Sequence, residues 1–534
     1  LAITDHGVVH SFPDAYNRLV GYYEKKHKDL FPKGRPRREA YLEAIEKRGA
    51  AKLIFGMEGY LVDDRDARDE NHDKPWHIII LAKNLTGLKN LYKIVSASHL
   101  EYFYKKPRIP RSLLNKHREG LILGTACYLG ELYQAILEQK QEKVIEEIAA
   151  GYDYFEIQPD TNNMFLLKNG TLASMEDLHR INKKIVELGK KMYKPVAATC
   201  DVHFLNKKDR TYREFLMLAM GFEEADAELY LRTTDEMLEE FAYLGPELAR
   251  EVVITAPHKI AALIEPALEP VPSKIHPPSL PDADNKIREA TWKRADELYG
   301  DKILPEVKER IERELKSIIG NNYAVLYLIA KVMVERSNQD GYIVGSRGSV
   351  GSSIVAFLCG ISEVNPLQAH YLCPECRHME FIDTELAGVD MDPKKCPQCK
   401  VEMARDGFNI PFETFMGFKG DKVPDIDLNF SGEYQEKIHN FLINMFGKEK
   451  VFKAGTINTL QQNAIKKDFM NKYIEKTGSN LKNAEKMRLA MGCADVKRGT
   501  GQHPGGLMLV PDDKEIFDFT PVQYAPDKES ITTH

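Results

Sequence analysis

Short apolar segments alternate with longer helical stretches over the first part of the chain. The apolar segments read LAIT, KLIFGMEG, HIIILAKN, GLILGTAC, YFEIQ and KPVAATCDVH. Alternation of strands and helices predicts parallel βαβ units, here an N-terminal (β/α) barrel. Because strand ends of such a barrel converge on one face, side chains that are far apart in sequence meet there. The potential metal ligands in or after these strands therefore predict a metal site: Asp5, His6, Glu58, Cys127, Asp201 and His203.

A proline-rich stretch, Glu265 to Pro281, marks a domain boundary because it sustains neither a helix nor a central strand. After it, the pattern predicts a helix from Leu304 to Ile319, then an apolar YIV and a strand-like DIDLNF. The chain after Glu433 is mostly helical as far as GTGQHPGG, and the following LMLV reads as a strand. The predicted fold class is therefore α/β and multidomain.

The length of the chain limits the architecture. Its 534 residues predict three or four domains, at roughly 100 to 200 residues per domain. No apolar run approaches the roughly 20 residues of a membrane-spanning helix, which argues against a membrane role. The chain begins with Leu and a strand-like segment and not with a signal peptide, so we expect the natural N-terminus to lie upstream.

Positive charge is concentrated in one segment. The formal net charge is −6, yet the residues from Lys448 to Arg498 include 12 Lys or Arg against 5 Asp or Glu. Such a local excess is typical of a surface that binds nucleic-acid phosphates. A solvated helical face explains this stretch equally well.

Four of the eight cysteines form two CxxC pairs with 19 residues between them: Cys373, Cys376, Cys396 and Cys399. Four thiolates at this spacing predict a closed, tetrahedral Zn²⁺ site of the ribbon type, which stabilises a fold and does not catalyse. Chance clustering of buried cysteines is the alternative. The other cysteines are scattered, so the pattern favours a metal site over a disulfide framework and indicates a reducing, cytoplasmic compartment.

A loop rich in glycine and serine follows YIV. Its glycines allow backbone N–H groups to approach an anion, its hydroxyls donate hydrogen bonds, and Arg347 offers a fork for phosphate oxygens. The spacing and the lysine of a Walker A motif are both missing. A flexible turn is therefore as good an interpretation as a triphosphate site, which would be lined by Gly345, Ser346, Arg347, Gly348, Ser349, Gly351, Ser352 and Ser353.

Two carboxylates, Asp425 and Asp427, lie in the segment DIDLNF. In a strand they point to the same face, with Ile426 and Leu428 on the other. Paired carboxylates suit two Mg²⁺ ions, one for the attacking hydroxyl and one for the leaving pyrophosphate. Solvated turns also often contain DxD, so this pair is informative only together with the loop and the cysteines.

Taken together, four segments closely resemble the PolC type of the C-family bacterial DNA polymerase III alpha subunit. They are GYIVGSRGSVGSS, the cysteine ribbon, IPFETFMGFKGDKVPDIDLNFSGEYQ and RGTGQHPGGLMLVP. The N-terminal region resembles the PHP domain of that family, through AITDHG, GMEG and CDVHFLN. The resemblance covers essentially the whole chain.

The resemblance implies a role for each motif. Asp425 and Asp427 are two of three palm carboxylates that bind Mg²⁺, and Gly345 to Ser353 holds the triphosphate of the incoming nucleotide. Lys422, Arg498 and His503 lie in matching motifs and contact the nucleotide or the DNA backbone. In the PHP domain the implied ligands of Zn²⁺ or Mn²⁺ are His6, Glu58, His77, Cys127, Asp201 and His203.

The resemblance also implies a division into domains. The expected parts are a PHP domain at 1–264, a first palm segment at 282–433 with the zinc ribbon at 370–402, a thumb at 434–497 and a second palm segment at 498–534. We expect the HxH motif that opens a PHP domain and the third palm carboxylate to lie outside the chain, which makes residues 1–534 alone inactive. The short polar connection from Asp64 to Trp76 replaces the exonuclease that PolC proteins usually carry there.

The expected substrates are primer-template DNA and dNTPs, and the family implies a sliding clamp and replisome proteins as partners. Two other interpretations remain. The chain would be a PHP metallophosphoesterase with a zinc ribbon that binds nucleic acid, or a zinc-ribbon scaffold without catalysis. Both leave the Gly/Ser/Arg loop and DIDLNF without a role.

Overall fold

The chain folds into two compact units. The computed structural model describes residues 1–70, 74–222, 227–274, 276–301, 303–417, 422, 424–527 and 530–534. The first unit comprises Leu1–Ser273, Lys453–Pro504 and Ile516–His534, and the second comprises Lys274–Phe452 and Gly505–Glu515. The boundary after Ser273 falls inside the proline-rich stretch from Glu265 to Pro281.

A six-stranded sheet forms the centre of the first unit. Its order is β4-β5-β2-β3-β6, with β1 paired to β2, and a separate parallel pair is formed by β7 and β8. All six apolar segments of the N-terminal region are strands, as predicted. The bounds are β1 (Ala2–His6), β2 (Ile54–Val62), β3 (Trp76–Ala82), β4 (Phe103–Tyr104), β5 (Lys106–Pro110), β6 (Leu121–Gly124), β7 (Phe155–Ile157) and β8 (Val196–Ala198).

The prediction of a parallel barrel is wrong for this sheet. Strand β3 is antiparallel to both β2 and β6, whereas β1 and β5 are parallel to β2. Parallel neighbours need a crossover, usually a helix, and the described residues between β2 and β3 contain only a 3₁₀ turn, Asp64–Asp66. A closed barrel would need the last strand, β8, to pair with the first, β1. Among the described residues no ladder joins these two strands, so the barrel does not close. Residues 71–73 of the predicted polar connection lie outside the described residues.

Helices pack around these strands, and α9 (Met175–Met192), which packs against β7 and β8, shows why they do. Its buried residues recur at helical spacing, and Ser174 and Asp177 form a capping box at its start. The other helices of this part are α1 (Phe12–Lys26), α2 (Arg37–Arg48), α3 (Leu85–Leu100), α4 (Arg111–Lys116), α5 (Glu131–Leu137), α6 (Glu142–Ala150), α7 (Asp160–Asn163), α8 (Phe165–Lys168), α11 (Thr234–Glu240), α12 (Pro246–Arg250) and α13 (Ala256–Ala262).

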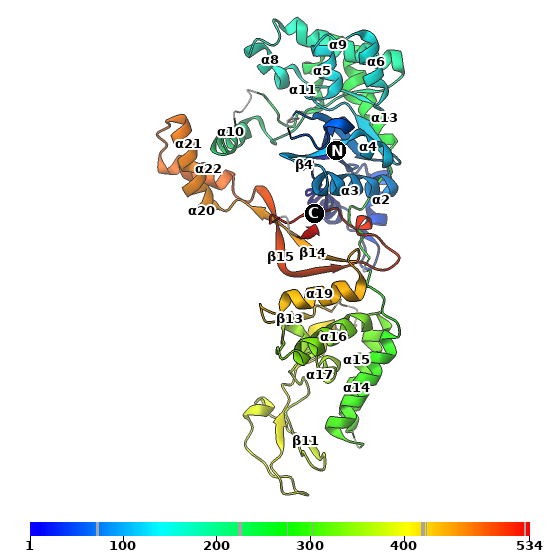
Figure 1. Ribbon diagram of the computed structural model, residues 1–534, viewed down its shortest axis with the longest axis vertical. Helices are drawn as coiled ribbons and strands as arrows, with labels where there is room; N and C mark the ends of the chain where they lie inside the picture. Colours follow the sequence, from blue (N-terminus) through cyan, green and yellow to red (C-terminus); the bar gives the residue numbers. More distant parts are fainter. Residues whose placement is uncertain are drawn as a thin grey trace. The chain divides into compact units, whose positions relative to one another are not determined.

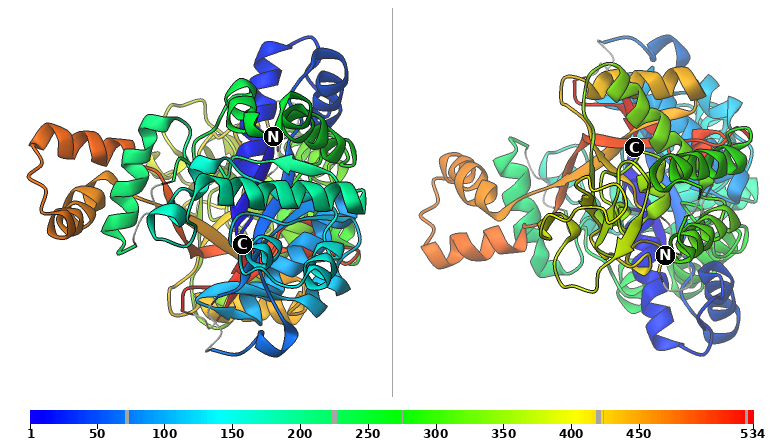
Figure 2. Two further views of the ribbon diagram at one scale, coloured as in Figure 1. Left: turned by 90° about the horizontal axis from the view of Figure 1, so that it is seen from above. Right: turned by 90° about the horizontal axis from the view of Figure 1, so that it is seen from below.

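A second apolar core joins α10 (Arg210–Ala219) to α20 (Gln462–Ala464), α21 (Met470–Thr477) and α22 (Asn483–Gly492). In Figures 1 and 2, α10 lies beside these helices, which are coloured orange. The packing is close, because a Cβ at Gly492 would lie 2.1 Å from the Tyr212 ring. A helix from the predicted PHP segment therefore completes the core of the predicted thumb. The core contains Phe215, Ala219, Leu460, Ile465, Phe469, Met470, Leu489, Ala490 and Cys493.

A four-stranded sheet has the order β15-β14-β17-β16. The segment GTGQHPGG does not form a separate loop, because it continues into LMLV as the single strand β15. Strand β15 lies at the edge of the sheet. An edge strand tolerates Pro504, which has no backbone N–H to donate to a neighbouring strand. The bounds are β14 (Val451–Thr459), β15 (Lys497–Leu509), β16 (Val522–Tyr524) and β17 (Ile531–Thr533).

The core of the second unit is helical. Helices α14, α15, α16 and α17 pack against one another, and α15 corresponds to the helix predicted from Leu304. The helices are α14 (Ala283–Tyr299), α15 (Pro305–Gly320), α16 (Ala324–Gln339), α17 (Ile354–Leu358), α18 (Glu413–Met416) and α19 (Gln435–Phe446). The strands are β9 (Gly345–Arg347), β10 (His370–Leu372), β11 (Met379–Phe381), β12 (Ala404–Asp406) and β13 (Asp427–Asn429).

In the described part of the chain, no single helix has the length and apolar character to cross a membrane. Helices α15 and α16 pass such a test only as a pair, and they are bent by 108° at the break between them.

A pair of stacked histidines in the first unit predicts pH-dependent stability. The rings of His10 and His534 lie 3.8 Å apart, and burial, with His99 nearby, lowers the pKa of His10 from 6.5 to about 4. Between these values the unfolded chain binds more protons than the folded chain, so the free energy of unfolding falls as the pH falls through this window. In chemical denaturation, we expect the free energy of unfolding of His10→Phe to fall less between pH 6.5 and 4.5 than that of the wild-type chain. Replacing the exposed His258 with Phe is the control. If the free energy of unfolding of His10→Phe changed with pH as steeply as that of the wild-type chain, His10 would not be the group responsible.

Candidate functional site

The Gly/Ser/Arg loop and the carboxylate segment are neighbouring strands in the second unit. Strand β13 pairs antiparallel with β9, so that Asp427 lies opposite Arg347 and Leu428 opposite Ser346. Opposite residues of an antiparallel pair project from the same face. Arg347 Nη2 lies 3.6 Å from Asp427 Oδ2, and the two side chains are 69% and 45% exposed. The pairing therefore presents a cation and a carboxylate together to solvent.

The two faces of the carboxylate segment differ as the alternating pattern predicts. Ile426 and Leu428 pack against the apolar core of the second unit. Asp425, just before β13, is exposed, and Asp427 is partly exposed. Both carboxylates are thus open to a ligand, and their oxygens are of the kind that Mg²⁺ prefers.

Several hydroxyls of the loop are occupied by other protein groups. Ser346 donates from its N–H and its Oγ to Glu363 Oε2, at 3.4 and 3.2 Å. Ser352 Oγ donates to the carbonyl of Ser349, and Ser353 caps the N-terminus of α17 through the N–H of Ala356. Of the predicted anion-binding groups, Arg347 and Gly348 are exposed and Ser349 is partly exposed, whereas Gly351 and Ser352 are buried. The sequence gives no local signal for Glu363, which lies in a polar loop.

The other predicted nucleotide contacts are distributed over the chain. Lys422 is exposed, and its N–H donates to the carbonyl of Met416. Arg498 and His503 lie on β15 within the first unit, where the Arg498 guanidinium is 5.0 Å from the centre of the Phe469 ring. Their contact with a nucleotide stays a prediction.

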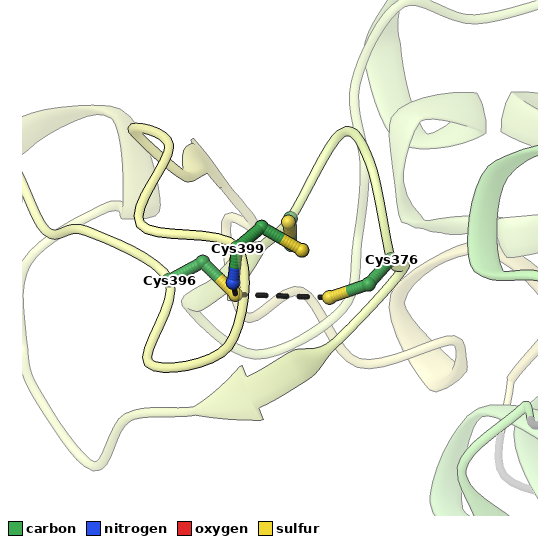
Figure 3. Close-up of side chains that lie close together, drawn as sticks. Cys376, Cys396 and Cys399 are labelled. Carbon is green, nitrogen blue, oxygen red and sulfur yellow. Dashed lines mark hydrogen bonds between the residues drawn. The ribbon is translucent and has the colours of Figure 1, made fainter.

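The four predicted thiols meet in the second unit. One sulfur atom from each of Cys373, Cys376, Cys396 and Cys399 lies within 4.8 Å of the others, and no disulfide joins them. The two CxxC turns have the same backbone pattern. The residues after them, Arg377 and Lys400, are both left-handed, with φ of 60° and 64°, and donate to the carbonyls of Cys373 and Cys396. Figure 3 shows Cys376, Cys396 and Cys399 pointing toward one another, with Cys376 Sγ and Cys396 Sγ 3.7 Å apart.

The pKa values of the thiols in the cluster are shifted in different directions: the hydrogen bond with Cys376 raises the pKa of Cys399, whereas the pKa of Cys373 is lowered. Burial tends to raise the pKa of Cys373, but the N–H groups of Cys376 and Glu375 outweigh it and lower the pKa to about 7. A thiolate is therefore accessible near neutral pH. Four sulfurs at this separation suit a tetrahedral, closed site.

A second cluster of ligand atoms lies in the first unit. Glu58, His77 and Cys127 are all buried, and their ligand atoms lie within 4.8 Å of one another. Glu58 Oε1 is 2.5 Å from His77 Nδ1, which is 3.3 Å from Cys127 Sγ. Neither Glu58 Oε1 nor His77 Nε2 has a hydrogen bond of good geometry among the described residues. A carboxylate, an imidazole and a thiol that converge in a buried position fit a bound cation.

Histidines surround this cluster. His6 Nε2 lies 3.8 Å from Glu58 Oε1, and the His6 and His203 rings are 5.2 Å apart. Asp201 adopts a left-handed φ of 51°, an uncommon conformation for this residue, and lies beside His203. Burial alone would raise the pKa of Glu58, but His77, His6 and His203 hold it below its ordinary value. Burial raises the pKa of the Cys127 thiol well above its ordinary value.

Two acids near this cluster differ from the prediction. Asp5 does not join it, because Asp5 Oδ2 accepts from the N–H and Oγ of Ser11 at 3.0 and 2.6 Å. Glu156 was not predicted, yet burial raises its pKa to about 7 in the field of Glu58 and Asp201. An acid between apolar neighbours in YFEIQ is the signal that identifies such a residue.

Comparisons with known proteins agree with this arrangement. The model of the bacterial DNA polymerase III alpha NTPase domain matches residues 285–481 and 470–534, and the PHP domain model matches residues 1–160. "DNA polymerase III PolC-type" of Clostridium perfringens is 50% identical over 86% of this chain and 32% of its own length. The proteins of that name from Caldanaerobacter subterraneus and Bacillus subtilis are 53% and 47% identical, each over 86% of this chain and 33% of their own length.

The agreement extends across both units, because one domain model matches the N-terminal region and the other matches the segment with the loop and the carboxylates. The chain spans about a third of the length of these curated relatives. By sequence, it belongs to the PolC-type DNA polymerase III family.

Proposed function

We propose that this chain is part of the catalytic region of a DNA-directed DNA polymerase for chromosome replication. The polymerase transfers a nucleotidyl group from a dNTP to the primer 3′-hydroxyl. The observation that carries the proposal is the pairing of β9 with β13. It places Arg347 of the Gly/Ser/Arg loop beside Asp427 of the carboxylate pair, 80 positions later in the chain. An anion-binding group beside metal-binding oxygens is what a metal-bound triphosphate requires.

Each group then has a role. Asp425 and Asp427 hold Mg²⁺, and two such ions, when bound, activate the attacking hydroxyl and stabilise the leaving pyrophosphate. Arg347 binds phosphate oxygens through its fork, and the glycines of the turn allow the backbone to approach them. Lys422, Arg498 and His503 contact the nucleotide or the DNA backbone.

We propose the domain boundaries that the resemblance implies: PHP domain 1–264, palm 282–433 and 498–534, zinc ribbon 370–402 and thumb 434–497. The thumb binds primer-template DNA through phosphates, which its excess of Lys and Arg favours. The sliding clamp and replisome proteins are the proposed partners of the whole protein, in the cytoplasm.

The thiol cluster is proposed to hold one structural Zn²⁺. The support is the matched geometry of the two CxxC turns and the closed set of four sulfurs. Closed ligation leaves no position for a substrate, so this ion stabilises the ribbon.

The first unit is proposed to bind Zn²⁺ or Mn²⁺ through Glu58, His77 and Cys127, with His6, Asp201 and His203. The convergence of three buried ligand atoms, one each from Glu58, His77 and Cys127, favours this assignment. A PHP metallophosphoesterase is the second candidate function, and the same atoms favour it. Only the polymerase proposal gives Asp425 and Asp427 a role.

Removing the carboxylates tests the main proposal. In a PolC-type polymerase that carries this chain, Asp425→Asn and Asp427→Asn should each lower kcat for primer extension by about a thousandfold or more, because two-metal transfer needs both ligands. Binding of primed DNA should change little. The exposed Glu433→Gln is the matched control. Wild-type extension by either Asp variant would refute the assignment of the catalytic pair.

Arg347→Ala should weaken nucleotide use more than DNA binding, because it removes the charged fork beside Asp427. We expect the KM for dNTP to rise at least about tenfold, with the Kd for primed DNA within about twofold. Arg377→Ala, in the cysteine ribbon, is the control. If dNTP kinetics were unchanged in Arg347→Ala, the loop would be an ordinary turn.

Cys396→Ser/Cys399→Ser should contain one equivalent of zinc less than the wild-type chain, because two of the four ligands are lost. Metal analysis of freshly purified protein measures this difference. Cys359→Ala, which alters a buried cysteine outside the cluster, should retain the wild-type content. Full retention by the double variant would mean that the thiols do not bind the metal.

A further inference from the structure

Glu314, on α15, is a carboxylate with no exposed surface in the core of the second unit. Its Oε1 accepts from Arg310 Nε at 2.5 Å, one helical turn away. Burying an ion pair costs desolvation that apolar side chains of similar volume avoid, so fold stability alone does not explain such a pair. The other contacts of Glu314 and Arg310 show what the pair holds in place.

Both members of the pair bind the end of the Gly/Ser/Arg loop. Glu314 Oε2 accepts from Ser353 Oγ at 2.9 Å and from the Val355 N–H at 3.3 Å. Arg310 Nη2 donates to the carbonyl of Ser352 at 2.8 Å. The pair thus holds three groups of the loop exit: the Ser352 carbonyl, the Ser353 hydroxyl and the Val355 N–H.

The Ser353 hydroxyl has no capacity left for a ligand. It donates to Glu314 and accepts from Tyr327 Oη at 3.2 Å and from the Ala356 N–H at 3.1 Å. A hydroxyl has one donor and two acceptor positions, and all are used. Ser353, predicted as part of a triphosphate site, is instead buried in this network.

The start of the loop is held by the pairing of β9 with β13 and by two hydrogen bonds from Ser346 to the exposed carboxylate of Glu363. The two anchored ends leave the stretch from Arg347 to Gly351 between them. Within it, Gly348 has a φ of +78°, and a Cβ there would lie 3.7 Å from Asp427 Oδ2. The orientation of this stretch relative to the carboxylates therefore depends on how firmly its ends are fixed.

We propose that Glu314 is a positioning residue for the incoming nucleotide: it fixes the backbone of Ser352–Val355, and through it the stretch Arg347–Gly351, without touching the nucleotide. The inference rests on the proposed function of the loop as a triphosphate site. A loop whose ends are already fixed loses less conformational freedom when it binds a triphosphate, so loss of the anchor should weaken nucleotide binding more than the chemical step.

The test uses a PolC-type polymerase that carries this chain, with Glu314→Gln and Ser353→Ala. Both variants should raise the KM for dNTP about tenfold, while kcat per active site and the Kd for primed DNA stay within about twofold. A purely structural role predicts the opposite, namely a smaller fraction of active sites with an unchanged KM. Glu312→Gln, at an exposed position of the same helix, should behave as wild type.

Arg347→Ala in the same assay separates the two proposals. A raised KM in Arg347→Ala with a normal KM in Glu314→Gln and Ser353→Ala overturns the positioning role alone, whereas a normal KM in all three overturns the triphosphate site itself. If Glu314→Gln does not fold, the positioning role is tested by measuring amide hydrogen exchange in Ser353→Ala. Faster exchange of the Val355 and Ala356 amides supports the anchor, and unchanged exchange overturns it.

Discussion

Backbone pairing between β9 and β13 is the interaction on which the candidate active site depends. A ribbon of two such short strands is marginal by itself, so it needs packing beneath it. Ile426 and Leu428 supply that packing through the core of the second unit. The register matters as much as the pairing, because a shift by one residue would move Asp427 to the core face and Leu428 to solvent. Apolar burial on one face therefore fixes the position of the charged groups on the other.

The two clusters of metal-ligand atoms differ in the number and kind of their ligands. The ribbon closes four identical ligands inside two matching turns. The cluster in the first unit mixes a carboxylate, an imidazole and a thiol, and His6 beside it is 49% exposed. A closed set of four sulfurs suits a structural ion, whereas a mixed set of three ligands leaves a coordination position for water or a substrate group. The two proposed metals thus have different chemical capacities.

Sequence reasoning identified elements and local motifs better than their pairing. All six N-terminal strands, the helix α15 and the strand in DIDLNF follow from periodicity, and the CxxC spacing correctly predicted the meeting of four thiols. The strand directions did not follow, because β3 reverses after a connection whose path periodicity does not specify. Glu314 and Glu363 were missed for a related reason. A glutamate in a charged helix or a polar loop looks like any surface acid, and only tertiary contacts show what it binds.

The core shared by α10 and the helices α20–α22 has a consequence for how such proteins change over time. A segment that is cut from the chain near residue 264, or exchanged there with another protein, takes Phe215 and Ala219 away from Phe469 and Leu489. The remaining helices would expose an apolar surface, and the contact between Gly492 and Tyr212 leaves no room for a larger residue at position 492. Recombination is therefore constrained to keep two segments together that are separated by more than two hundred residues of intervening sequence.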